Sequence, residues 1–511
     1  MTRRELFAFV GILIVAIATL LVFGGGILWT RPLWFDELCC VVFVVRDASS
    51  PVDLIAKVAR SWDYAPPLLH LIVWTVSRFT RGDVSAALLR NISLVSVSLA
   101  SLFVYATLRR RFSRAPAVAG TLAVAGHPLV LAHAFEGRFY GPWLLFAAGF
   151  AWALGLDADL PHSPRRNIAL ALIACLLVAI HWFGVLSLGL MCAGAVAVFY
   201  PRWRDGVRLI APSGAALIAL LALAPMALAQ RANASGKLWV ENLSADQVLE
   251  MARNFWFAAV PIVAVALLLL NRFSPQRPYA LTSGGPPAPD LAALLSLALM
   301  PVVLMALSVA LQPSMVTRYA IVATLAWAPL VAMAVALFEP RFQDACIAAL
   351  ALVMVVVAQR AVTEKREYAD LVKANTVAFE KAKTMNLPVV FLGLHSIYPV
   401  AGPERSAQSP ARDLDLPDST IAALFPSEPM APIRKKYRLD RDQARGHGRI
   451  YGFPVLATQA ELDTTSRFIL LATDASLPGG YKSPQLFGRA LFPRHRAVRI
   501  DSTLSLFERT R

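Results

Sequence analysis

Two adjacent carboxylates, Asp36 and Glu37, follow the first long apolar run of the chain, within the stretch LWFDELCC. An ionised aspartate is purely a hydrogen-bond acceptor, and one that faces a cavity can take a proton from a substrate hydroxyl. An acidic pair at this place can also cap the next helix, and composition alone does not separate the two interpretations. The pair is therefore a candidate general base with a structural alternative.

Further polar side chains stand at the ends of other apolar runs. They are Asp63, Tyr64, Glu136, Arg138, Tyr140, His181, Arg318 and Tyr319. A guanidinium such as that of Arg318 suits a pair of phosphate oxygens, and His181 suits a metal ion or a phosphate oxygen. Plainer interpretations stay open: an interfacial ion pair for Glu136 and Arg138, and an arginine that snorkels to the membrane surface for Arg318.

Composition indicates which elements must position these groups. Of the 511 residues, 57% are hydrophobic and 16% are charged, and the mean hydropathy is +0.57, which excludes an ordinary soluble protein. Apolar runs near the roughly 18–20 residues that cross a bilayer recur through the first two thirds of the chain. The net charge of +16 comes from basic residues scattered over short loops. That distribution favours membrane topology over nucleic-acid binding.

We therefore predict a polytopic α-helical membrane protein with about eleven transmembrane helices. The expected spans are residues 7–30, 91–108, 115–133, 140–156, 168–182, 183–200, 208–228, 254–270, 291–311, 319–338 and 343–360. The segment 66–79 is short for a span and opens with two prolines, so we place it along the outer surface. The alternative is a tilted span there and an extra crossing elsewhere.

Basic loops fix the orientation of this threading. With Arg3 and Arg4 inside, five basic loops also fall inside: residues 109–114, 162–167, 201–208, 271–278 and 339–342. The segments that carry the candidate residues then all emerge outside, together with everything after the last span. They are 31–90, a large first outer loop, and 133–142, 181–184, 229–247 and 312–319. We expect the candidate groups to meet at one face of the membrane.

Residues 362–511 have the composition of a separate soluble domain, which the threading places outside, after a transmembrane domain at 1–361. A charged helical pattern at 363–386 is followed by three strand-like runs, PVVFLGL, RFILLAT and AVRIDSTLSLFE, which predict a small α/β module. The Pro- and Gly-rich stretch 280–290 is expected to be a flexible inner linker.

Neither cysteines nor histidines form a metal-binding pattern. Cys175, Cys192 and Cys346 lie within apolar runs, and Cys39 and Cys40 are neighbours without a zinc-type spacing. The spacing of His127, His133 and His181 matches no metal template. We therefore predict no certain cofactor, and a divalent metal stays open.

Taken in order, these motifs resemble the family 39-type glycosyltransferases of the GT-C fold, which include bacterial relatives of protein O-mannosyltransferases and the lipid A aminoarabinose transferases. The resemblance covers most of residues 30–340. The acidic pair matches Asp36 and Glu37, and the family's EARPY appears as residues 136–140, which keep Glu, Arg and Tyr but lose the proline. An RY motif matches Arg318-Tyr319, whereas the family's HPPL reads APPL at 65–68 and lacks its histidine.

The resemblance implies a polyprenyl-phosphate sugar as donor and an active site at the extracytoplasmic face of a bacterial inner membrane. Asp36 would be the catalytic base beside Glu37, with the donor phosphate on Arg318, Arg138 and Tyr319. The acceptor would be a glycolipid, polysaccharide or protein hydroxyl, with Asp63, Tyr64, Glu136, Tyr140 and His181 around the substrates. The main alternative is a lipid or polysaccharide transporter or flippase. Such a protein normally carries charges at mid-membrane or broken helices in paired halves, which this sequence does not show.

Overall fold

The computed structural model describes fourteen stretches of the chain. They are residues 37, 43–46, 48–60, 64–80, 84–159, 163–233, 245–257, 288–311, 316–384, 389–391, 421–423, 467–471, 495–499 and 504–509. Of these, residues 44–362 belong to one compact unit, whereas residues 37, 43 and 363–509 belong to another. The expected span at 7–30 and the candidate residues Asp36 and Asp63 lie outside the described residues.

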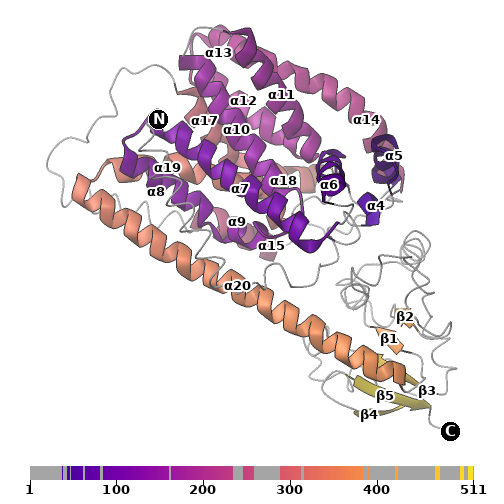
Figure 1. Ribbon diagram of the computed structural model, residues 1–511. Helices are drawn as coiled ribbons and strands as arrows, with labels where there is room; N and C mark the ends of the chain where they lie inside the picture. Colours follow the sequence, from indigo (N-terminus) through magenta and orange to yellow (C-terminus); the bar gives the residue numbers. More distant parts are fainter. Residues whose placement is uncertain are drawn as a thin grey trace. The chain divides into compact units, whose positions relative to one another are not determined.

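The first unit is a bundle of helices (Figure 1). In chain order these are α4 (Phe43–Arg46), α5 (Pro51–Arg60), α6 (Leu68–Phe79), α7 (Ala86–Arg109), α8 (Arg114–Ala125), α9 (Pro128–His133), α10 (Tyr140–Asp159), α11 (Pro164–Ile180), α12 (Gly184–Ala197), α13 (Trp203–Ile210), η2 (Ala211–Gly214), α14 (Ala215–Asn233), α15 (Ala245–Ala252), η3 (Arg253–Phe257), α17 (Pro289–Ser296), η4 (Leu297–Leu299), α18 (Met300–Ala310), η5 (Thr317–Ala326), α19 (Trp327–Ala336) and α20 (Pro340–Thr384).

Six apolar helical stretches in the described part of the chain are long enough to cross a bilayer. They are Ala86–Arg109, Tyr140–Asp159, Trp203–Arg231, Pro289–Ala310, Thr317–Ala336 and Pro340–Thr363. The chain is therefore a multi-pass membrane protein, and its predicted class, a polytopic α-helical protein, is confirmed. The total of about eleven spans stays a prediction. The 12-residue α6 is too short to cross by itself.

Three expected spans differ in detail from the helices. The run 115–133 is broken at Gly126 and His127, because Gly126 ends α8 and the ring of Pro128 fits only the first turn of a new helix. The run 183–200 is helical only over Gly184–Ala197. The run 319–338 begins as a tighter 3₁₀ segment, η5, and continues as α19.

Helix α10 lies at the centre of the bundle and packs against α7, α11, α17 and η5 (Figure 1). It is apolar on all sides and buried over most of its length, as expected of a helix without a solvent face. A close approach fixes its start, since a Cβ on Gly141 would meet the backbone oxygen of Ser93 on α7 at 2.7 Å. The residues at the two ends of α10 are therefore held at a fixed separation of about 30 Å.

A cluster of ion pairs closes the final turn of α10. Asp290, at the start of α17, is fully buried and accepts from the guanidiniums of Arg110 (2.9 Å) and Arg111 (3.2 Å). Asp159 also binds Arg111, at 2.9 Å. Burial works to lower the pKa of the Arg111 guanidinium, but Asp290 and Asp159 outweigh it and raise that pKa. Gly155 contacts the Arg110 guanidinium, so a side chain there would displace it.

This cluster corrects one expectation. The stretch 280–290 does not end as a flexible linker, because Pro289 occupies the first turn of α17 and Asp290 is buried beside the two arginines. An aspartate in the first turn of a helix is also stabilised by the helix dipole. The buried charge thus has both a helix end and two cations to balance it.

The second unit contains five described strands: β1 (Val389–Phe391), β2 (Ile421–Ala423), β3 (Arg467–Leu471), β4 (His495–Arg499) and β5 (Leu504–Arg509). They form one sheet in the order β2-β1-β3-β5-β4. Strands β2, β1 and β3 are parallel, whereas β5 is antiparallel to β3 and to β4. The run AVRIDSTLSLFE, expected to be one strand, therefore supplies two, and polar residues 501–503 separate their apolar parts.

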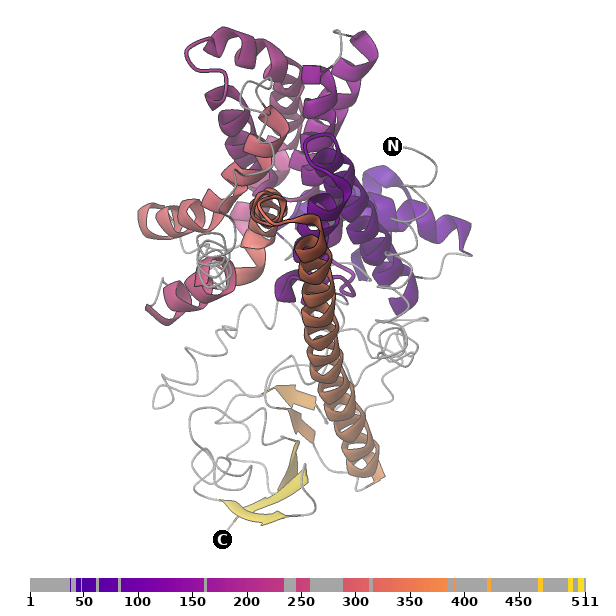
Figure 2. The ribbon, with the colours of Figure 1, turned by 90° about the vertical axis from the view of Figure 1, so that its left-hand side faces the viewer.

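Helix α20 is one unbroken helix of 45 residues, as Figure 2 shows. Its first part, Pro340–Thr363, is apolar enough to cross a membrane. The charged pattern predicted as a separate helix after residue 362 continues it to Thr384. The composition changes near the expected domain boundary, but the helix does not end there.

Candidate functional site

The segment that precedes α10 brings an arginine, a glutamate and aromatic rings to the start of that helix. Glu136, Arg138 and Tyr140 are all at least 95% buried. Residues 134–139 are not helical, and this short connection places Glu136 and Arg138 on different partners. The predicted site residues of this segment therefore lie in the protein interior and not on its surface.

His181 is the centre of an aromatic cluster at this end. Its ring lies 4.2 Å from that of Phe139 and 4.5 Å from that of Trp143, both measured between ring centres. Tyr319, from the start of η5, lies 5.3 Å from the same imidazole. Three segments that are far apart in the sequence, 138–143, 181–183 and 318–319, thus meet at one place.

The protonation of His181 follows from its backbone contact. The N–H of Phe183 donates to Nδ1 of His181 at 3.1 Å, so Nδ1 carries no proton and a neutral ring has its proton on Nε2. His181 therefore offers an N–H donor, and Nδ1 is occupied by the main chain.

Two arginines border the cluster. The guanidinium carbon of Arg138 lies 4.8 Å from the ring centre of Phe139, and that of Arg318 lies 6.0 Å from the ring centre of Tyr319. The negative face of an aromatic ring attracts a guanidinium. Since Phe139 and Tyr319 both contact His181, the two arginines belong to one site.

His133 and Glu136 form a short polar contact beside the cluster. Nδ1 of His133 lies 2.6 Å from Oε2 of Glu136, and the His133 ring lies 4.7 Å from that of Tyr140. This contact with Glu136 fixes the orientation of the His133 ring. In the described part of the chain no group of three or more histidine, cysteine or acidic side chains is placed to hold a metal ion.

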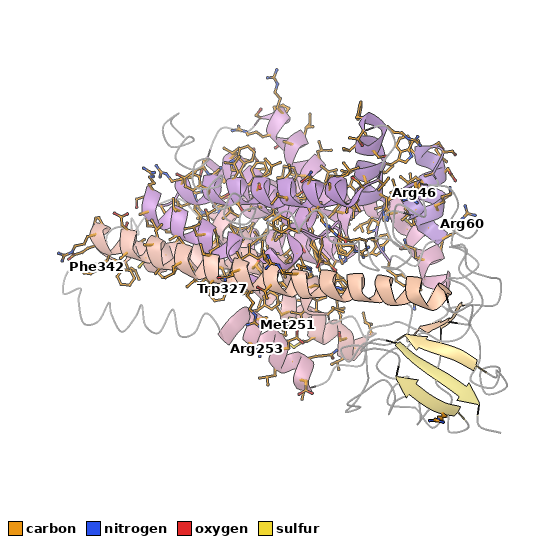
Figure 3. All side chains as sticks on the ribbon, turned by 60° about the horizontal axis from the view of Figure 1, so that its bottom comes forward. Arg46, Arg60, Met251, Arg253, Trp327 and Phe342 are labelled. Carbon is orange, nitrogen blue, oxygen red and sulfur yellow. The ribbon has the colours of Figure 1, made fainter. Side chains whose placement is uncertain are left out.

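Residues 31–90, which the sequence predicts to form a large outer loop, are described in part. Tyr64 is half-buried in the connection between α5 and α6, and burial raises the pKa of its phenol. Glu37 is fully buried. Figure 3 shows Arg46 and Arg60, at the ends of α4 and α5, on one side of the bundle, and Phe342, near the start of α20, on the opposite side.

Sequence reasoning left out several residues of this site. His133, Phe139 and Trp143 were not among the predicted site residues, and neither was Arg90, which is fully buried on α7. Arg90 precedes Ser93 by one helical turn, and the Ser93 hydroxyl donates to the carbonyl of His133 at 3.4 Å. From the sequence, Arg90 stood directly before the expected span 91–108, whereas α7 begins at Ala86 and includes it; a buried charge within a membrane segment usually has a function.

Comparison with solved structures identifies the fold. The structure aligns with the crystal structure of apo ArnT from Cupriavidus metallidurans with a TM-score of 0.60, over 98% of each chain and with 12% sequence identity. With ArnT from the same organism bound to undecaprenyl phosphate, the TM-score is 0.55 over 97% of this chain and 98% of that chain, again with 12% identity. No protein-family model and no curated protein matches the sequence.

ArnT is a glycosyltransferase of the GT-C fold, and the present chain has the same fold, as its motifs predicted. At 12% identity the alignment shows the fold alone. The narrower resemblance to family 39 stays a prediction, as do the individual roles of the site residues.

Proposed function

We propose that this protein is a membrane glycosyltransferase that moves a sugar from a polyprenyl-phosphate donor to a hydroxyl acceptor at the extracytoplasmic face of a bacterial inner membrane. The observation that carries the proposal is the meeting of Arg138, His181, Arg318 and Tyr319 at one end of a GT-C-type bundle. Two guanidiniums beside an imidazole that can donate a hydrogen bond are suited to a phosphate group. The undecaprenyl phosphate bound in the similarly folded ArnT is a ligand of that chemistry.

The reaction is a single displacement with inversion at the anomeric carbon. Asp36 takes the proton of the acceptor hydroxyl, the acceptor oxygen bonds to the anomeric carbon, and the bond from that carbon to the phosphate oxygen breaks. Polyprenyl phosphate leaves with the bonding electron pair. Arg318 and Arg138 stabilise the charge that develops on the phosphate, and such stabilisation is usually the largest contribution to catalysis. Glu37 supports Asp36 or orients the acceptor.

The remaining polar groups bind the substrates. Glu136, Tyr140 and His181 stand in the cluster with Arg138, and Asp63 and Tyr64 belong to the first outer loop. The acceptor is a hydroxyl of a glycolipid, a polysaccharide or a protein. No step of this mechanism uses a metal ion.

Proteoliposomes with a labelled polyprenyl-phosphate sugar test the proposal. We expect the wild-type protein to release polyprenyl phosphate and to form a product of inverted anomeric configuration. Asp36→Asn should reduce the rate about 10²–10⁴-fold, the range for loss of a general base. Full activity of Asp36→Asn would refute the assignment of the base, and repeating the assay after EDTA tests for a divalent metal.

The same assay distinguishes a transporter from a glycosyltransferase. A flippase or transporter moves the lipid-linked sugar across the membrane and leaves its glycosyl–phosphate bond intact. Recovery of unchanged donor in the opposite leaflet, without free polyprenyl phosphate, would therefore overturn the proposed function.

A further inference from the structure

One buried amide, that of Gln230 near the end of α14, connects three backbone segments. Its Oε1 accepts from the indole N–H of Trp182 at 3.0 Å. Its Nε2 donates to the carbonyl of Val58 at 3.1 Å and to the carbonyl of Ala65 at 3.0 Å. The side chain is 99% buried, so these bonds form away from bulk water.

The contacts fix which way the amide points. An indole nitrogen only donates, and a backbone carbonyl only accepts. The oxygen of Gln230 must therefore face Trp182, and the nitrogen must face the two carbonyls. Both N–H groups of the amide are used, and no other uncharged side chain of this length combines one acceptor with two donors.

The three segments are parts of the proposed active site. Trp182 follows His181, the centre of the aromatic cluster. Val58 and Ala65 stand on either side of the segment that carries Asp63 and Tyr64. Figure 1 shows α14 beside α5 and α11, and these helices are in contact. The amide thus connects Val58 and Ala65 to Trp182, the neighbour of His181.

We propose that Gln230 is a positioning residue that holds Val58 and Ala65 in place relative to Trp182, the neighbour of His181, so that Tyr64 meets the substrate. This inference rests on the proposed function. Gln230 need not touch a substrate in this role. It acts through two carbonyls and an indole, and removal of its amide leaves all three without their partner.

The test combines local hydrogen exchange with steady-state kinetics on the full-length protein. Gln230→Met keeps the length and apolar stem of the side chain but removes all three bonds. Since each buried polar group that loses its partner is costly, we expect amide exchange in peptides covering residues 54–71 to accelerate about tenfold or more. We expect the KM of the donor or of the acceptor to rise about tenfold in parallel, with kcat changed less than about threefold.

Gln343→Met is a matched control. Gln343 is also buried, and its amide donates to a carbonyl, that of Phe338 at 2.8 Å, but it lies at the start of α20. This variant should leave exchange at 54–71 and both KM values unchanged. Gln230→Glu gives a second comparison, because a carboxylate still accepts from Trp182 but cannot donate to the two carbonyls. It should resemble Gln230→Met and not the wild type.

The outcomes are distinguishable. Unchanged exchange at 54–71 in Gln230→Met, or faster exchange with both KM values unchanged, would overturn the positioning role. Absence of transfer by the wild-type protein would overturn the proposed function, and the exchange measurement would still decide whether Gln230 holds the segment. If Gln230→Met does not fold, Trp182→Phe removes a single hydrogen bond. It should accelerate amide exchange at 54–71 and raise the KM by about threefold each.

Discussion

The two ends of α10 hold arginines in different surroundings. At its final turn, Arg110 and Arg111 share the buried carboxylate of Asp290 at 2.9 and 3.2 Å. Just before its start, Arg138 lies over the ring of Phe139, and Arg318 lies over that of Tyr319. The guanidiniums at the first end pair with carboxylates, whereas those at the second end lie 4.8 and 6.0 Å from the centres of aromatic rings.

That difference separates a structural cluster from a candidate binding site. When a guanidinium is paired with a carboxylate, its charge is largely balanced and several of its N–H groups are already hydrogen-bonded within the fold. Contact with an aromatic ring is weaker than an ion pair and does not cancel the positive charge of a guanidinium. We therefore expect changes at the ion-pair end to alter stability, and changes at the aromatic end to alter catalysis.

The largest effect is expected from Asp290→Asn. The change removes the charge that balances two partly buried guanidiniums, and loss of one partner of a buried ion pair costs about 3–5 kcal/mol. We expect a clearly lower Tm in detergent, measured by tryptophan fluorescence, with kcat of the remaining folded protein close to that of the wild type. Asp205→Asn, an exposed aspartate in the first turn of α13, is the control and should leave the Tm unchanged. An unaltered Tm in Asp290→Asn would contradict a structural role for the ion-pair end.

A matched pair of arginine variants tests the comparison directly. Arg138→Gln should reduce kcat by about 10²–10³, the usual cost of losing one group that stabilises developing charge. Arg110→Gln should lower the Tm and change kcat less than about threefold, because its guanidinium serves the fold. Both variants are measured in the same proteoliposome assay. Equal losses of kcat in the two would remove the distinction between the ends of α10.

The sequence predicted which polar groups meet, because basic loops determine on which side of the membrane each apolar run ends. Arg138, His181 and Tyr319 were placed together in this way, and the structure brings them within one cluster. The neighbours of each group were not predictable. Asp290 stands in a Pro- and Gly-rich stretch that reads as a linker, and only the packing of α17 shows that it is buried between arginines.

Gln230 illustrates the same limit. Its position just beyond the apolar run 208–228 marks it as an ordinary interfacial glutamine, since the sequence gives no sign that a backbone carbonyl 165 residues away is its partner. Contacts between distant segments depend on how helices pack, and periodicity within one segment carries no information on them. Strand β2 was not predicted either, because its three residues, Ile421–Ala423, show no alternating pattern.

The smallest effect, and the sharpest comparison, comes from two ring contacts near the two ends of α10. Phe139 contacts His181 at the candidate site, and Phe103 on α7 contacts Trp152 at 5.1 Å, near the ion-pair end. A Leu at either position keeps an apolar side chain but removes the ring, which should cost about 0.5–1.5 kcal/mol. We expect Phe139→Leu and Phe103→Leu to lower the Tm by similar amounts. Only Phe139→Leu should also raise the donor KM, because Phe139 orients Arg138. A rise of the donor KM in Phe103→Leu as well would show that substrate binding responds to general loosening of α10 and not to the rings that surround His181.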